Sequence, residues 1–201
     1  GILMCQAESA DAVRAFVESC RYPHHPAGVD PALPSPVDRM HGAVRETKNG
    51  LGIGTRGRGS EATAAPIWGI SAEGYIERCD PWPLDPKGEL LLGVKLESPE
   101  GIANCEAILA VPGLGFAELG PGDLGLSLGY VSVPREPYPA EMREARQRVF
   151  AACRRNRIAF LETGSPETIA AKLDAGVRVI AGHREETAII GRAHQRRTMP
   201  A

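Results

Sequence analysis

The sequence predicts an α/β protein with a parallel β-sheet. Short apolar runs alternate with segments whose apolar residues recur at helical spacing. The apolar runs are unbroken, as in strands that are covered on both faces. Strands that alternate with helices are typical of parallel sheets. A barrel and an open doubly wound sheet both fit this pattern, although five strand–helix units are too few to close an eight-stranded barrel.

The expected strands are the apolar runs that are too short to form helices. They cover residues 1–6, 90–96, 115–120, 158–161 and 177–181. Ser9 is a suitable N-cap for the first helix, and the pairs Ser98-Pro99 and Ser165-Pro166 place a capping serine before a proline at the first helical position. Further helices are expected over residues 71–79, 137–156 and 185–196.

A long irregular segment interrupts this alternation at about residues 22–66. Five prolines lie between residues 23 and 36 and five glycines between residues 50 and 59, so only a short helix over residues 37–46 is expected there. Loops of this length inside a domain are often functional. His24 and His25 therefore either reach an active site, if the loop folds over it, or stay exposed to solvent.

The composition is that of an ordinary globular protein and excludes some classes of function. The 201 residues are 43% apolar and 24% charged, with a net charge of −2, and a single domain over residues 1–201 is expected. A nearly neutral chain has no electrostatic basis for binding nucleic acid or an anionic membrane. No apolar stretch is long enough to span a bilayer.

The cysteines indicate the compartment of the protein, and the first residues indicate where the sequence begins within a domain. Five scattered cysteines without a CxxC pair do not form a disulfide framework or a zinc motif, which predicts a reducing cytoplasm. No secretory leader is recognisable. The chain opens directly on an apolar strand without an initiator methionine, so we expect the sequence to begin within a domain.

Polar residues follow the ends of two consecutive expected strands. Glu97 and Asp123 come after the second and third of them. Neighbouring strands lie about 5 Å apart, so these carboxylates can share a hard divalent cation; alternatively, each acid caps a helix. The Gly120-Pro121-Gly122 turn either exposes backbone N–H groups that suit a substrate carboxylate or is a plain tight turn.

Three motifs give the chain a family resemblance. They are VKLESPEG at residues 94–101, ILAVPG at residues 108–113, and GPGDL at residues 120–124 with SLGY at residues 127–130. In order and spacing they resemble the HpcH/HpaI aldolase and citrate lyase family of class II, pyruvate-dependent aldolases. The resemblance implies a (β/α)8 TIM barrel of the phosphoenolpyruvate/pyruvate type, of which this chain contains about five-eighths and lacks the first strands.

The resemblance also implies roles for individual residues. Glu97 and Asp123 are the implied metal ligands, for Mg²⁺, Mn²⁺ or Co²⁺, and the backbone at Gly122 and Asp123 is implied to bind the carboxylate of a 2-oxo acid. The family's catalytic His and Arg lie on strands that no part of this sequence matches, so both stay unassigned. His183, after the last strand, is a candidate base or substrate contact, or else a loop or capping residue.

Lys95 departs from the family pattern, which has Gln at this substrate-side position. Lys95 and Glu97 are two residues apart, so both side chains lie on one face of the strand. Three roles are open for Lys95: an ion pair with Glu118 on the next strand, a contact with the substrate carboxylate, or a Schiff base as in class I aldolases.

The predicted function is a metal-dependent carbon–carbon lyase. It would cleave or form aldol adducts between a pyruvate-type 2-oxo acid and an aldehyde, and the resemblance implies a homo-oligomer, either a hexamer or a trimer. One alternative is a related lyase that acts on a malyl- or citryl-CoA thioester. The other is a catalytically incomplete subunit with a structural role.

Overall fold

A parallel β-sheet forms the centre of the molecule. The computed structural model describes residues 1–43, 50–182 and 184–196. The strand order is β1 (Ile2–Met4), β3 (Leu90–Leu96), β4 (Phe116–Leu119), β5 (Ala159–Thr163) and β6 (Val179–Ala181), and β2 (Pro81–Trp82) also pairs with β3. Every strand pair is parallel. The predicted α/β class with a parallel sheet is confirmed.

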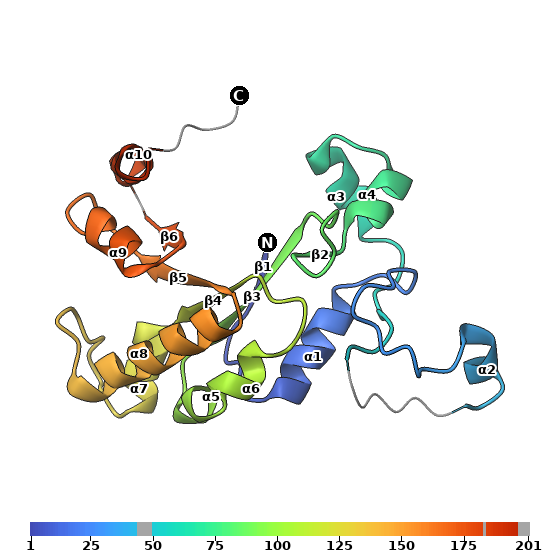
Figure 1. Cartoon of the computed structure of the whole chain (residues 1–201), viewed down its shortest axis with the longest axis horizontal. Coiled ribbons are helices and arrows are strands. Elements are labelled where there is room, and N and C mark those ends of the chain that lie inside the picture. Colours follow the sequence, from blue (N-terminus) through green and yellow to red (C-terminus); the bar gives the residue numbers. More distant parts are fainter. Residues whose placement is uncertain (44–49, 183, 197–201) are drawn as a thin grey trace.

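The described strands form an open sheet rather than a closed barrel (Figure 1). β1 and β6 lie at the two ends of the strand order, and no pairing joins them within the described ranges. The sheet has six strands, whereas a barrel of the type that the sequence predicts closes with eight. The closed (β/α)8 barrel therefore stays a prediction.

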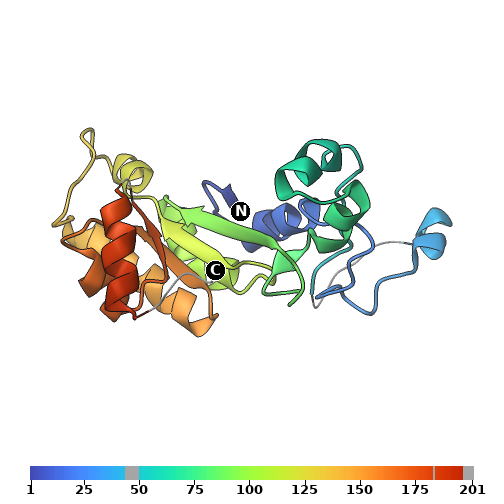
Figure 2. The ribbon, with the colours of Figure 1, turned by 90° about the horizontal axis from the view of Figure 1, so that it is seen from above.

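Helices cover the outer side of the curved sheet (Figure 1). Those that follow the strands are α1 (Ala10–Ser19), α5 (Pro99–Ala103), α6 (Cys105–Leu109), α7 (Pro121–Ser127), α8 (Ala140–Arg155), α9 (Ile169–Ala175) and α10 (Glu185–His194). α2 (Pro36–Met40), α3 (Glu61–Trp68) and α4 (Ala72–Arg78) lie at one end of the elongated molecule, and α9 and α10 lie at the other (Figure 2). Within the described part of the chain, no helix combines the length and apolarity that crossing a membrane requires.

The observed elements differ from the expected ones in a few places. α3 lies partly inside the segment expected to be a loop, and the sequence does not predict β2. The helix expected after β3 is split at Asn104 into α5 and α6. The helix expected at Ser165 begins only at Ile169, and the Ser165 N–H donates to Thr168 Oγ1 over 2.9 Å. The end of the helix expected over residues 37–46 lies outside the described residues.

The core lies between the sheet and its helices, on one face of β3. Leu92, Val94 and Leu96 are fully buried there, in one cluster with side chains of α1, α6 and α8. Successive side chains of a strand point to opposite faces. Lys95 and Glu97 therefore lie on the other face, at the carboxyl end of the strand. This cluster extends along the chain from Ala7 to Val177; the single domain over residues 1–201 stays a prediction.

Helix α5 packs directly onto the loop between β1 and α1. A Cβ atom on the buried Gly101 would lie 2.6 Å from the carbonyl oxygen of Ala7. The Asn104 Nδ2 group donates to the Glu8 carbonyl over 2.8 Å. The helix and the loop therefore approach so closely that the contact requires glycine.

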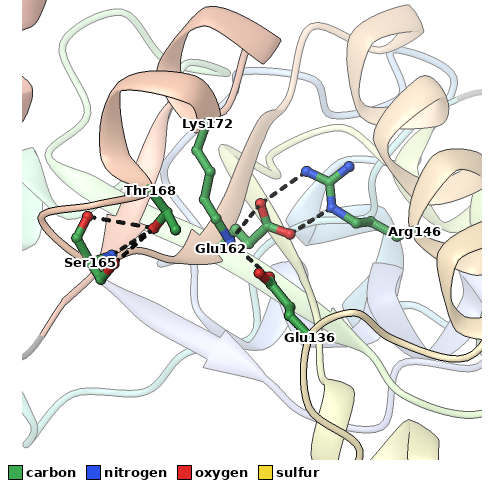
Figure 3. Close-up of polar contacts among 6 residues, drawn as sticks. All are labelled: Glu136, Arg146, Glu162, Ser165, Thr168 and Lys172. Atoms are coloured by element: carbon green, nitrogen blue, oxygen red, sulfur yellow. Dashed lines mark hydrogen bonds and ion pairs between the residues drawn. The ribbon is translucent and has the colours of Figure 1, made fainter.

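A charged cluster joins β5 to the helices that cover it (Figure 3). Arg146 of α8 donates to both carboxylate oxygens of Glu162 over 2.6 and 2.9 Å. Lys172 of α9 lies 3.5 Å from Glu162 and 3.1 Å from Glu136. Burial alone would raise the pKa of Glu162, but Arg146 and Lys172 outweigh burial and lower it from its ordinary value of 4.5. The cluster thus fastens α8 and α9 to one strand.

Replacing Gly101 with Ala tests the contact between α5 and the loop. Alanine ordinarily stabilises a helix relative to glycine by about 1 kcal/mol. Here the added methyl group clashes with the backbone, so we expect Gly101→Ala to lower the free energy of unfolding by about 1–3 kcal/mol in urea denaturation. Gly57→Ala is the control, because a Cβ there meets nothing within 4 Å. Stabilisation by Gly101→Ala would contradict the close packing.

The charged cluster predicts how stability depends on pH. Because the pKa of Glu162 is lowered in the folded chain, its ionised form stabilises the fold above about pH 4.5, and this contribution is lost as the pH falls through the lowered pKa. We expect Glu162→Gln to lower the free energy of unfolding by about 2 kcal/mol or more at neutral pH. The loss should shrink in acid, as urea denaturation at several pH values would measure. The exposed Glu144→Gln should show neither effect.

Candidate active-site rim

Glu97 is a buried acid at the carboxyl end of β3. Its side chain is 2% exposed. Oε1 accepts a hydrogen bond from the Gln6 N–H over 3.0 Å, and Gln6 has a φ of 54°, in the left-handed region that non-glycine residues seldom adopt. Oε2 is buried and accepts no hydrogen bond from the residues that the structure describes. A buried carboxylate oxygen that accepts no hydrogen bond is costly. The Lys95 ammonium, 3.3 Å away, compensates its charge, but Oε2 remains a position where a ligand would be favourable.

Gly120 provides the space for this carboxylate. A Cβ atom at Gly120 would lie 2.2 Å from Glu97 Oε2 and 2.8 Å from Lys95 Cε. The Gly120 N–H also donates to the carbonyl of Leu96 over 3.1 Å, which holds the end of β4 against the end of β3. Any larger residue at this position would push the Glu97 and Lys95 side chains aside.

Asp123 lies in the first turn of α7, and its side chain is exposed. The Ser127 hydroxyl lies within hydrogen-bonding distance of two carbonyls, those of Glu97 at 3.2 Å and Asp123 at 2.9 Å. The backbone segments that carry the two acids are therefore side by side. Gly122 and Asp123 have N–H groups in the first turn, where an α-helix offers no internal acceptor, and a Cβ on Gly122 would meet nothing within 4 Å.

Neither acid caps a helix, which was the alternative to metal binding. Ser98 caps α5, because its Oγ accepts from the Gly101 N–H over 3.1 Å. The N-cap of α7 is Gly120, and no side chain caps that helix within the described residues. The chemistry of the donors fits a hard cation: one buried carboxylate with an available oxygen and one exposed carboxylate on an adjacent turn. Metal binding by Glu97 and Asp123 stays a prediction.

Lys95 forms an ion pair with Glu97, not with Glu118, which was one of the three roles open for it. In the register of the sheet Lys95 lies opposite Glu118, as predicted. Its Nζ atom nevertheless lies 3.3 Å from Glu97 Oε2, in a geometry that does not satisfy a hydrogen bond. Burial opposes the charge of Lys95, but Glu97 and Glu118 outweigh burial and raise its pKa. Burial raises the pKa of Glu118.

A second group of possible metal ligands lies at the opposite end of β3. His25, Asp80 and Asp85 bring one ligand atom each within 4.8 Å of the others. Asp80 already forms a fully buried bidentate pair with Arg21, over 2.6 and 2.9 Å. A divalent ion there would lie beside a buried guanidinium, so we read this group as structural.

The position of His25 corrects one expectation about the long loop. His25 is 5% exposed, and its Nε2 atom lies 3.0 Å from the Ile76 carbonyl oxygen. Asp80, close by, accepts at its carbonyl from the N–H of Leu90, the first residue of β3. Seven residues of strand, roughly 20 Å, separate this end from Glu97. His25 is thus neither solvent-exposed nor near the candidate rim.

His183, the candidate base, lies outside the described residues, so the catalytic base stays unassigned.

Sequence reasoning missed the Arg21–Asp80 pair, whose partners are 59 residues apart and carry no shared local pattern. It also missed Gln6, whose contribution is a backbone N–H that any residue type supplies.

Curated relatives of this chain are aldolases. It is 28% identical over 181 residues to the hydroxypyruvate/pyruvate aldolase of Roseobacter denitrificans, covering 90% of this chain and 56% of the relative. It is 37% identical over 78 residues to the 2-keto-3-deoxy-L-rhamnonate aldolase of Klebsiella pneumoniae, covering 39% of this chain and 26% of the relative. The chain therefore spans little more than half the length of the first of these proteins.

Solved structures and the family pattern agree with these relatives. A HpcH/HpaI aldolase/citrate lyase family protein from Burkholderia cenocepacia superimposes with a TM-score of 0.61 at 21% identity, over 96% of this chain and 62% of that one. At that identity the likeness concerns the fold alone. The pattern of the HpcH/HpaI aldolase/citrate lyase family matches residues 1–172. This chain therefore belongs to the HpcH/HpaI aldolase/citrate lyase family.

Proposed function

We propose that this chain carries the metal-binding part of a carbon–carbon lyase, an aldolase that acts on adducts of a 2-oxo acid. Family membership and the two aldolase relatives support the reaction class. The observation that carries the site is the Glu97 carboxylate, buried at the carboxyl edge of the sheet with one oxygen that accepts no hydrogen bond among the described residues. Ligands of parallel α/β folds bind at this edge.

In this proposal Glu97 and Asp123 hold a divalent cation, which is Mg²⁺, Mn²⁺ or Co²⁺. Such a cation supplies Lewis-acid chemistry that stabilises the negative charge of an enolate. The Gln6 N–H orients Glu97 by holding Oε1, which leaves Oε2 for the ion. The backbone N–H groups of Gly122 and Asp123 bind the carboxylate of the 2-oxo acid, and burial of Glu97 keeps water from competing for it.

Further parts of the proposal concern the whole protein. The substrates are a 2-oxo acid and an aldehyde. The strands of this chain form part of a (β/α)8 barrel. The protein assembles as a homo-oligomer, either a hexamer or a trimer. The open sheet, with β1 and β6 at its ends, supports completion by further strands. All five cysteines are free thiols, four of them buried, which suits a reducing cytoplasm.

Exchange of the pyruvate methyl protons for deuterium tests the enolate chemistry without knowledge of the aldehyde. We expect NMR to detect exchange that requires Mg²⁺ or Mn²⁺ and stops with EDTA. Glu97→Gln and Asp123→Asn should each reduce its rate by about a hundredfold or more, because each removes a metal ligand. Glu100→Gln, an exposed acid three residues from Glu97, should leave the rate unchanged.

The exchange assay, combined with an assay of CoA-thioester turnover, distinguishes the competing functions. Full exchange in Glu97→Gln would remove this residue from the site. Turnover of a malyl- or citryl-CoA thioester without exchange of free pyruvate would favour the CoA-dependent lyase. Absence of both reactions, with intact circular dichroism and bound metal, would indicate a catalytically incomplete chain, as expected where the family's catalytic His and Arg are lacking.

A further inference from the structure

We propose that Lys95 is an internal cation that competes with the divalent ion for Glu97 and so limits the metal affinity of the rim. The inference rests on the proposed function, because it takes Glu97 as a metal ligand. It assigns to Lys95 a role that differs from the ion pair with Glu118, the substrate contact and the Schiff base considered from the sequence.

The two cations would need the same oxygen. Gln6 occupies Oε1 of Glu97 through its N–H, so Oε2 is the oxygen that faces a ligand. The Lys95 Nζ atom lies 3.3 Å from that oxygen. An ion such as Mg²⁺ bound to Oε2 at about 2.0–2.1 Å would lie in the space that the ammonium group faces, so the ion must displace the ammonium.

The surroundings keep Lys95 close to this position. Lys95 and Glu97 share one face of β3, and the Lys95 side chain lies beside Gly120, where an added Cβ would come within 2.8 Å of Lys95 Cε. The Lys95 side chain is 23% exposed, so it is only partly free to move into solvent. The ammonium therefore stays near the ion after it has been displaced.

Glu118 offers the displaced ammonium a second partner. It lies opposite Lys95 in the register of β3 and β4, and its side chain is half-buried. Lys95 can thus turn from Glu97 to the neighbouring strand without losing a carboxylate partner. The arrangement makes the exchange reversible: an ion takes Oε2 while the lysine moves to Glu118, and the lysine returns when the ion leaves.

Mn²⁺ binding to the whole chain tests the proposal without using activity. Electron paramagnetic resonance and calorimetry would give the dissociation constant for the wild type and for each variant. We expect Lys95→Gln to bind Mn²⁺ on the order of tenfold more tightly, because it removes a positive charge a few ångströms from the ion. Lys95→Arg keeps the charge and should stay closer to the wild type than Lys95→Gln.

Controls separate this proposal from that of the metal site itself. The exposed Lys87→Gln removes the same charge far from Glu97 and should leave the affinity unchanged. Circular dichroism and thermal unfolding of each variant would show that the fold is retained. Binding that is lost in Glu97→Gln but equal or weaker in Lys95→Gln would overturn the role of Lys95 alone. Binding that is absent from the wild type, or unaffected by Glu97→Gln, would overturn both proposals.

Discussion

The alternation of side chains along β3 is the constraint on which the candidate site depends. Leu92, Val94 and Leu96 must face the helices, because that face is the buried core of the domain. A shift of register by one residue would expose all three. With this register fixed, Lys95 and Glu97 necessarily lie on the opposite face, at the end where ligands of parallel sheets bind. The packing of apolar residues thus positions the charged ones.

Three charged clusters in this chain differ in how completely their acids are satisfied. Asp80 has both oxygens on Arg21, and Glu162 has both on Arg146 with Lys172 nearby. Glu97 has one oxygen held by a backbone N–H and the other near a poorly aligned ammonium. Complete clusters fasten elements together, whereas an incomplete buried one costs stability unless a ligand binds. Incompleteness, more than burial or acidity, distinguishes Glu97.

The sequence predicted those features that depend on local pattern. The strands were recognisable as apolar runs, and Glu97 stood out as an acid directly after one of them. α3 was missed because its position depends on tertiary packing, such as the edge-to-face contact between Trp68 and Tyr75, whose centroids are 4.8 Å apart. The sequence left the partner of Lys95 open, because a long flexible side chain reaches acids on its own strand as well as on the next one.

The open sheet could not be distinguished from a barrel for a related reason. Each strand–helix unit has the same local pattern in both architectures, and closure depends on the number and tilt of all strands together. The long segment of residues 22–66 likewise gave no local sign of where it packs. Backbone hydrogen bonds from Thr55 to Glu18 and from Arg56 to Arg21 hold these two residues of the segment at the end of α1.

Gly120 has a consequence for how this chain tolerates mutation. It provides no charge, donor or nucleophile from a side chain, yet a single methyl group there would occupy the volume of the Glu97 carboxylate. An added Cβ at Gly122, two residues away, would meet nothing within 4 Å, so the described residues leave room there for at least a methyl group. A saturation scan in the absence of ligand should therefore separate the two glycines. The first is constrained by its contact with Glu97 and Lys95, whereas the second would be constrained only under the proposed function, by the substrate carboxylate.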